Sequence, residues 1–82
     1  MDLDLFRQWL LDNKGLMKKS AGDVVSRVKR VNKLIHLEPH TSYEGIVMIL
    51  EKNEEFSKLS TFVKPQLKHS IRMYKEFIQE SK

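Results

Sequence analysis

The sequence predicts an all-α fold, a compact bundle of four helices with room for a fifth short one. Two observations support this prediction. Apolar residues recur at intervals of three and four in four successive segments, which places them on one face of a helix, and no segment alternates apolar and polar residues as a half-buried strand does. The chain has 82 residues, 40% of them hydrophobic, so we expect residues 1–82 to form a single domain around one core.

The first helix is expected to begin at Asp2 or Asp4 and to end at Asn13. Gly15 follows at the position where a left-handed residue closes many helices, and Leu16 can supply the hydrophobic contact that accompanies such a turn. The apolar stripe of this helix consists of Leu3, Phe6, Trp9 and Leu10, widened by Leu5 and Leu11.

The second helix is expected to start at Ser20, whose hydroxyl would cap the first turn together with Asp23 three residues later. It should end between His36 and Glu38, because Pro39 disfavours helical geometry in the residue before it. Its buried stripe consists of Val24, Val28, Val31 and Ile35, flanked by Val25 and Leu34. The opposite face collects Ser26, Lys29, Arg30 and Lys33, with Arg27 at its margin.

The third helix is expected to start at Thr41, with Glu44 completing a capping box. Residues 53–60 fit either a frayed extension of this helix or a short separate turn anchored by Phe56 and Leu59. The buried stripe of the third helix consists of Tyr43, Ile46, Val47 and Leu50.

The fourth helix is expected to begin between Ser60 and Lys64, with Pro65 in its first turn, where a missing N–H costs little. Its core stripe consists of Leu67, Ile71, Tyr74 and Ile78, widened by Phe77. A row of cations lies on one flank of that stripe: Lys64, Lys68, Arg72 and Lys75.

The net charge of +4 is distributed in blocks along the chain. Residues 14–36 carry seven cations and one anion, residues 37–57 carry five glutamates and one lysine, and residues 58–82 are basic again. Blocks that fall on particular helices can build one basic face. A row of lysines can also do no more than keep a helix surface solvated, so charge alone leaves both interpretations open.

Catalytic and metal chemistry are not expected from this sequence. The chain has no cysteine, which excludes disulfides and thiolate sites. His36 and His40 have the spacing of a helical metal-binding pair, but Pro39 lies between them and no third ligand is obvious, so we expect a loop pair without metal. No glycine-rich phosphate loop is present. We therefore expect no enzymatic activity and no cofactor.

The longest apolar run, residues 45–50, is too short to span a bilayer, and no signal peptide precedes the first polar helix. We accordingly expect no membrane association, a cytoplasmic location, and a module that is monomeric in isolation.

Residues 15–20 read Gly-Leu-Met-Lys-Lys-Ser, and residues 67–78 combine Ser70, an aliphatic residue, Arg72 and an aromatic-rich end. These segments resemble the entry to the second helix and the last helix of the core-binding domain of tyrosine recombinases, the family of the phage integrases. Ser20 stands where that family has a hydroxyl residue that caps the helix beside the DNA backbone. Val24 departs from the family pattern, which often has an aromatic residue there.

The resemblance implies a SAM-like helical domain that forms half of a clamp around double-stranded DNA for a catalytic recombinase domain in the parent chain. The second and fourth helices would face the major groove and the adjoining phosphates, so their cations should share one continuous positive surface. Phosphate contacts should dominate, because lysine-rich faces read bases poorly. The expected DNA-binding residues are Lys18, Lys19, Ser20, Lys29, Arg30, Lys33, Lys68, Arg72 and Lys75.

The alternative is a helical protein-interaction domain appended to other DNA-processing machinery, since small helical folds host many functions. Basic residues dispersed over the surface, together with an exposed apolar groove, would favour that alternative. The chain can also be a fragment whose function lies in the remainder of a longer protein.

Overall fold

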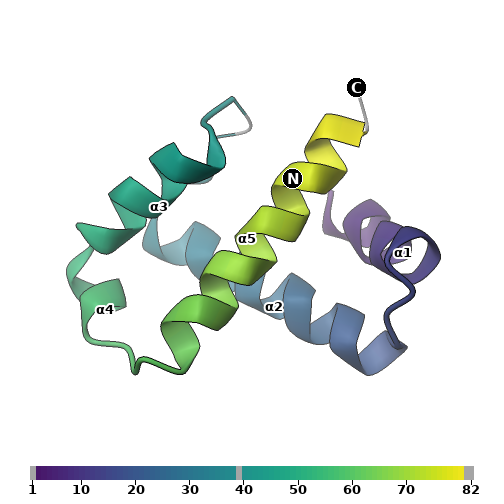
Figure 1. The fold of residues 1–82 in the computed structure, drawn as a ribbon, viewed down its shortest axis with the longest axis horizontal. Coiled ribbons are helices and arrows are strands. Elements are labelled where there is room, and N and C mark those ends of the chain that lie inside the picture. Colours follow the sequence, from purple (N-terminus) through teal and green to yellow (C-terminus); the bar gives the residue numbers. More distant parts are fainter. Residues whose placement is uncertain (1, 39, 81–82) are drawn as a thin grey trace.

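The computed structural model describes residues 2–38 and 40–80, and within them the chain forms five α-helices and no strand. In chain order they are α1 (Leu3–Asn13), α2 (Lys18–Leu34), α3 (Tyr43–Glu51), α4 (Glu54–Ser57) and α5 (Val63–Glu80). In Figure 1, α5 crosses in front of α2, with α1 to one side of the crossing and α3 and α4 to the other. The predicted all-α bundle is confirmed, and residues 53–60 form a short separate helix rather than an extension of α3.

The core lies where α5 crosses α2 and where α1 packs against both. The predicted apolar stripes face this core, which confirms the helical phases, but the prediction that Leu5 widens the first stripe is wrong: Leu5 is 60% exposed, because it lies on the side of α1 that no other helix covers. Six of their members are only half-buried: Leu3, Trp9, Ile35, Tyr43, Val47 and Ile78. The buried set also includes residues outside those stripes: Ala21, Val25, Leu37, Phe56 and Ser70. Ser70 is the one buried polar residue of the described chain, and its hydroxyl donates a hydrogen bond to the Gln66 carbonyl at 3.0 Å.

The predicted end of α1 is confirmed. Gly15 has φ +64°, the left-handed conformation that glycine adopts without steric cost. The amides of Lys14 and Leu16 both donate to the Leu10 carbonyl at 3.2 Å, so the turn satisfies a carbonyl that the helix leaves open. At the other end of α1, the Asp2 carboxylate accepts a hydrogen bond from the Leu5 amide at 3.0 Å.

The expectation that Ser20 caps α2 is wrong. The helix begins at Lys18, the N-cap residue is Met17, and the Ala21 amide donates to the Met17 carbonyl at 2.9 Å. Ser20 therefore lies inside the first turn, where its side chain is exposed. The first turn of α2 therefore forms without a side-chain cap.

The expectation that Thr41 caps α3 is wrong by one residue. The Ser42 hydroxyl accepts a hydrogen bond from the Gly45 amide at 3.1 Å, which makes Ser42 the N-cap. The Thr41 amide donates to the Glu38 carbonyl at 3.1 Å, so Thr41 belongs to the preceding turn. Glu44 consequently lies in the first turn of α3 and is not the partner of a Thr41 cap.

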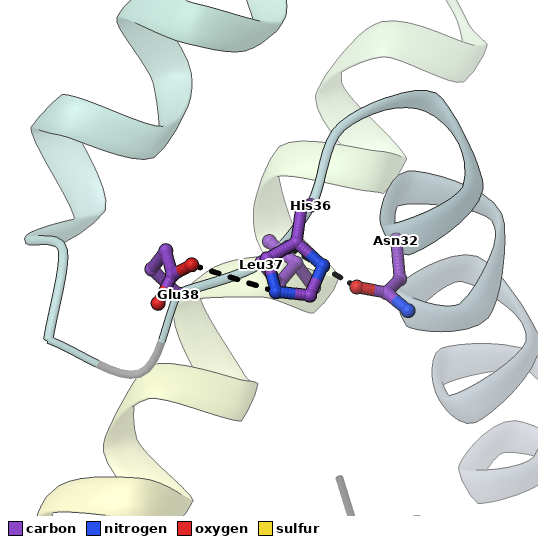
Figure 2. Close-up of polar contacts among 4 residues, drawn as sticks. All are labelled: Asn32, His36, Leu37 and Glu38. Atoms are coloured by element: carbon purple, nitrogen blue, oxygen red, sulfur yellow. Dashed lines mark hydrogen bonds and ion pairs between the residues drawn. The ribbon is translucent and has the colours of Figure 1, made fainter.

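The second helix ends at Leu34, slightly before the expected range of His36 to Glu38. The cause is Leu37, which is buried and must turn back toward the core. Figure 2 shows this exit: the Asn32 side chain accepts a hydrogen bond from the Leu37 amide at 3.1 Å, and the His36 ring lies 3.4 Å from the Glu38 carboxylate. Extended geometry begins at the C-cap residue that follows Leu34.

Candidate nucleic-acid interface

The exposed side of α2 is the most basic surface of a single helix in this fold. The valine stripe of α2 packs against α1 and α5, and at 100° per residue most of the charged residues of α2 point away from that stripe. Figure 1 shows α5 in front of α2, so the side of α2 that is turned away from α5 lies at the back of that view. We call this surface the α2 outer face: Lys18, Lys19, Asp23, Ser26, Lys29, Arg30 and Lys33, all exposed. Ser20 is also exposed, but it lies in the first turn at about the angle of Val31 and is not part of this face.

The five cations of the α2 outer face extend over about 22 Å of helix, at 1.5 Å per residue. None of them forms an ion pair within the described residues, in contrast to Lys14, which pairs with Glu76, and Lys68, which pairs with Glu51. Asp23 is the one carboxylate on α2. The positive charge of this face is therefore not neutralised by ion pairs within the described residues.

The cations of α5 have different surroundings, because they lie on the flank that packs toward α3 and α4. The Lys68 ammonium lies 2.7 Å from a Glu51 carboxylate oxygen and 6.0 Å from the centre of the Phe56 ring. Lys64 approaches the same ring at 5.8 Å. The hydrogen bond from Lys68 and then its charge lower the pKa of Glu51. Lys68 thus connects α5 to α3.

Arg72 is stacked on an aromatic ring rather than paired with a carboxylate. Its guanidinium carbon lies 4.6 Å from the centre of the Tyr43 ring at the start of α3. Glu76 lies one turn further along α5, at the spacing at which it could pair with Arg72. That carboxylate instead lies 2.6 Å from the Lys14 ammonium.

Lys75 is half-buried and lines a groove of about 420 Å³ between the start of α3 and the end of α5. The groove is also lined by Tyr43, Glu44 and Gln79. All three expected DNA-binding residues of α5 are consequently next to side chains of α3.

The structure therefore brings together five of the nine expected DNA-binding residues, Lys18, Lys19, Lys29, Arg30 and Lys33, and separates the other four. The five lie on one side of α2, opposite its valine stripe, whereas Ser20 lies on the valine side of the first turn and the three residues on α5 contact or adjoin α3. This arrangement does not support one positive surface shared by the two helices. Asp23 and Ser26 lie on the α2 outer face but were not among the expected site residues, although the phase of the valine stripe already places them opposite the core.

The described residues contain no group of three or more histidine, cysteine, aspartate or glutamate side chains that could hold a metal. His36 is exposed beside Glu38, and His69 is exposed on α5. Within the same residues, no helix is both long enough and apolar enough to cross a bilayer.

No protein-family model matches the sequence, and no curated protein or solved structure is significantly similar to the chain. The likeness to tyrosine-recombinase core-binding domains accordingly depends on the residues quoted for it above.

Proposed function

We propose that this chain is a DNA-binding module that contacts double-stranded DNA with the α2 outer face. The observation that carries the proposal is the set of five exposed cations on one side of α2, none of them ion-paired within the described residues. Duplex DNA carries one negative charge per about 1.7 Å of its axis, so a basic face of this length meets many phosphates in any register.

The composition of the α2 outer face favours nucleic acid over a protein partner. Lysine is depleted in the centres of protein–protein interfaces, which are enriched in aromatic residues and methionine. The α2 outer face carries four lysines and no aromatic residue. The absence of aromatic side chains also favours duplex over single-stranded DNA, because proteins that bind single strands stack bases on aromatic rings.

The resemblance to recombinase core-binding domains extends this proposal to site-specific recombination and DNA integration. The module would hold DNA for a catalytic recombinase domain of the parent chain and contribute no chemistry itself. Its proposed contact surface is α2 alone, since the cations of α5 are engaged with α3. The expected cytoplasmic location belongs to the same proposal, because the module must meet its DNA there.

The test is the salt dependence of duplex binding, measured by fluorescence anisotropy with a labelled duplex of about 20 base pairs. Neutralising Z phosphates gives a slope of log K against log salt near −0.9Z, so five contacts predict a slope of about −4 to −5. Lys29→Ala and Lys33→Ala should each make the slope less steep by about 0.9. Lys52→Ala, an exposed lysine at the end of α3, is the matched control and should leave the slope unchanged. A flat salt dependence, or no binding at low salt, would overturn the proposal.

A protein-interaction domain is the second candidate function, because several large apolar side chains are exposed. Met48 and Ile49 project from α3, and Phe62, just before α5, is 81% exposed. Absence of DNA binding at low salt in the same titration would make this candidate the better one.

A further inference from the structure

The third helix carries an apolar surface on the side turned away from the core. Its sequence contains a run of consecutive apolar residues from Ile46 to Leu50, and a helix can turn only part of such a run toward one side. Ile46 and Leu50 are buried, whereas Met48 and Ile49 are 60% and 50% exposed. Single exposed apolar residues are ordinary, but two neighbours on one short helix form a surface that a protein contact would cover.

The charges on the two sides of Met48 are arranged symmetrically. Glu44 precedes Met48 by four residues, and Lys52, the C-cap residue of α3, follows it by four. Residues four apart form a ridge along a helix, so opposite charges lie at the two ends of one ridge with Met48 in its middle. Both charged residues are exposed, and neither forms an ion pair within the described residues. We call these three residues the α3 ridge.

The α3 ridge is complementary to itself when two copies run in opposite directions. Helices contact each other most often through ridges of residues four apart. When two α3 ridges pack antiparallel about a two-fold axis at Met48, Glu44 of each copy lies beside Lys52 of the other copy. The same contact covers the apolar residues between the charges. A ridge with one carboxylate and one ammonium does not prefer a partner of either charge sign, which favours a second copy of the same ridge.

The exposed methionine at the start of α2 lacks this complementarity. Met17 is 79% exposed, but Lys18 and Lys19 follow it directly. A symmetric contact at Met17 would bring the lysines of two copies together, and like charges repel. Exposure of an apolar side chain is therefore not sufficient for self-association, and the α3 ridge differs from Met17 in the charges that surround it.

We infer that α3 is a self-association surface, through which two copies of this chain form an antiparallel contact between their α3 ridges. This inference goes beyond the proposed DNA binding and does not depend on it. It departs from the expectation that the module is monomeric in isolation. Since α3 has nine residues and is about 13 Å long, the contact belongs to the smallest and weakest class of interfaces, and we expect association at chain concentrations on the order of 0.1–1 mM.

The first experiment is sedimentation velocity of the natural chain at low salt and without DNA. The sedimentation coefficient should rise with concentration across the expected range. Glu44→Lys and Lys52→Glu each place like charges side by side in the contact, so each single variant should remain monomeric. The double variant restores opposite charges and should associate again. Thermal denaturation followed by circular dichroism establishes that each variant is folded.

A single cysteine provides a second measurement that leaves the charges unchanged. The natural chain has no cysteine. Met48→Cys places one at the two-fold axis, so mild oxidation of this variant should link two copies through a disulfide. Met17→Cys is the matched control, because Met17 is also exposed and lies outside α3, and it should form little disulfide-linked dimer.

The inference is overturned if the sedimentation coefficient of the natural chain stays constant up to about 1 mM, since a different protein would then be the better occupant of this surface. It is also overturned if the charge variants associate as the natural chain does, or if Met17→Cys and Met48→Cys form disulfide-linked dimers equally fast. Duplex titrations need only low micromolar chain, below the range of self-association. The proposed DNA binding is therefore tested separately, and Lys52→Ala remains a control there.

Discussion

Replacing Arg72 by alanine separates a structural role of α5 from a DNA-binding one. The guanidinium lies 4.6 Å from the centre of the Tyr43 ring, and Arg72 is exposed, so its cation–π interaction should be worth about 0.5–1 kcal/mol. For a domain of this size, a loss of 1 kcal/mol lowers the melting temperature by about 4–8 °C. We therefore expect Arg72→Ala to lower the melting temperature by about 2–8 °C.

The same substitution should leave the salt dependence of DNA binding nearly unchanged, because Arg72 is directed toward α3 and not toward the α2 outer face. Lys33→Ala provides the opposite pattern: a slope less steep by about 0.9 and an unchanged melting temperature. Thermal denaturation followed by circular dichroism, together with duplex titrations by anisotropy, measures both quantities on each variant.

A double-mutant cycle with Tyr43→Leu isolates the stacking interaction. In the Tyr43→Leu background the ring is gone, so Arg72→Ala should no longer affect stability. The reasoning fails if Arg72→Ala leaves the melting temperature unchanged and makes the salt slope less steep as Lys33→Ala does. That result would indicate that Arg72 of α5 contacts DNA.

Three further predictions concern the fold. Ile71 is 1% exposed, so Ile71→Ala should lower the free energy of unfolding in urea by about 2–5 kcal/mol, and a loss below about 1 kcal/mol would contradict the assigned phase of α5. Gly15→Ala should lower the free energy of unfolding by about 1–2 kcal/mol, because alanine is strained at the positive φ of this position. Gly22→Ala should raise it by about 0.5–1 kcal/mol, because Gly22 is helical and an added Cβ meets no atom within 4 Å. Equal effects of the two substitutions would be inconsistent with a left-handed Gly15. Lys68 lowers the pKa of Glu51 in the folded state, so the stability from that pair is present above the unfolded pKa near 4.5 and is lost as the pH falls through the folded value. Urea titrations should therefore show a larger loss of stability from about pH 6 to about pH 3 in the natural chain than in Glu51→Gln, and parallel losses would exclude this contribution.

The helices could be predicted from the sequence because helical phase is a local property. The valine stripe of α2 and the stripe around Leu67 and Ile71 follow the helical period without interruption, and both face the core. Helix starts were harder to predict, because two adjacent hydroxyl residues can each serve as a cap. Ser42 caps α3, and the Thr41 amide bonds to the Glu38 carbonyl in the preceding turn, a contact that periodicity does not encode.

The candidate site could be predicted only as far as it depends on one helix. The α2 outer face follows from the valine stripe alone. The surroundings of the α5 cations depend on which helix covers their flank, and that helix brings Glu51 to Lys68 and Tyr43 to Arg72. Charge blocks along the sequence give the number of cations on a helix, but not whether a neighbouring helix already engages them.

Trp9 gives the fold an intrinsic optical reporter. It is the single tryptophan of the chain, and its ring lies 5.8 Å from that of Phe77 on α5 and 5.6 Å from the Lys14 ammonium. Its indole N–H is buried without a hydrogen-bond partner among the described residues, so the chromophore is in a largely apolar setting. Separation of α1 from α5 would expose the indole to water and shift its emission to longer wavelength. The detachment of α1 can therefore be followed by the fluorescence of Trp9 in the unlabelled protein. This signal also reports a detachment that is faster than an equilibrium titration with denaturant can resolve.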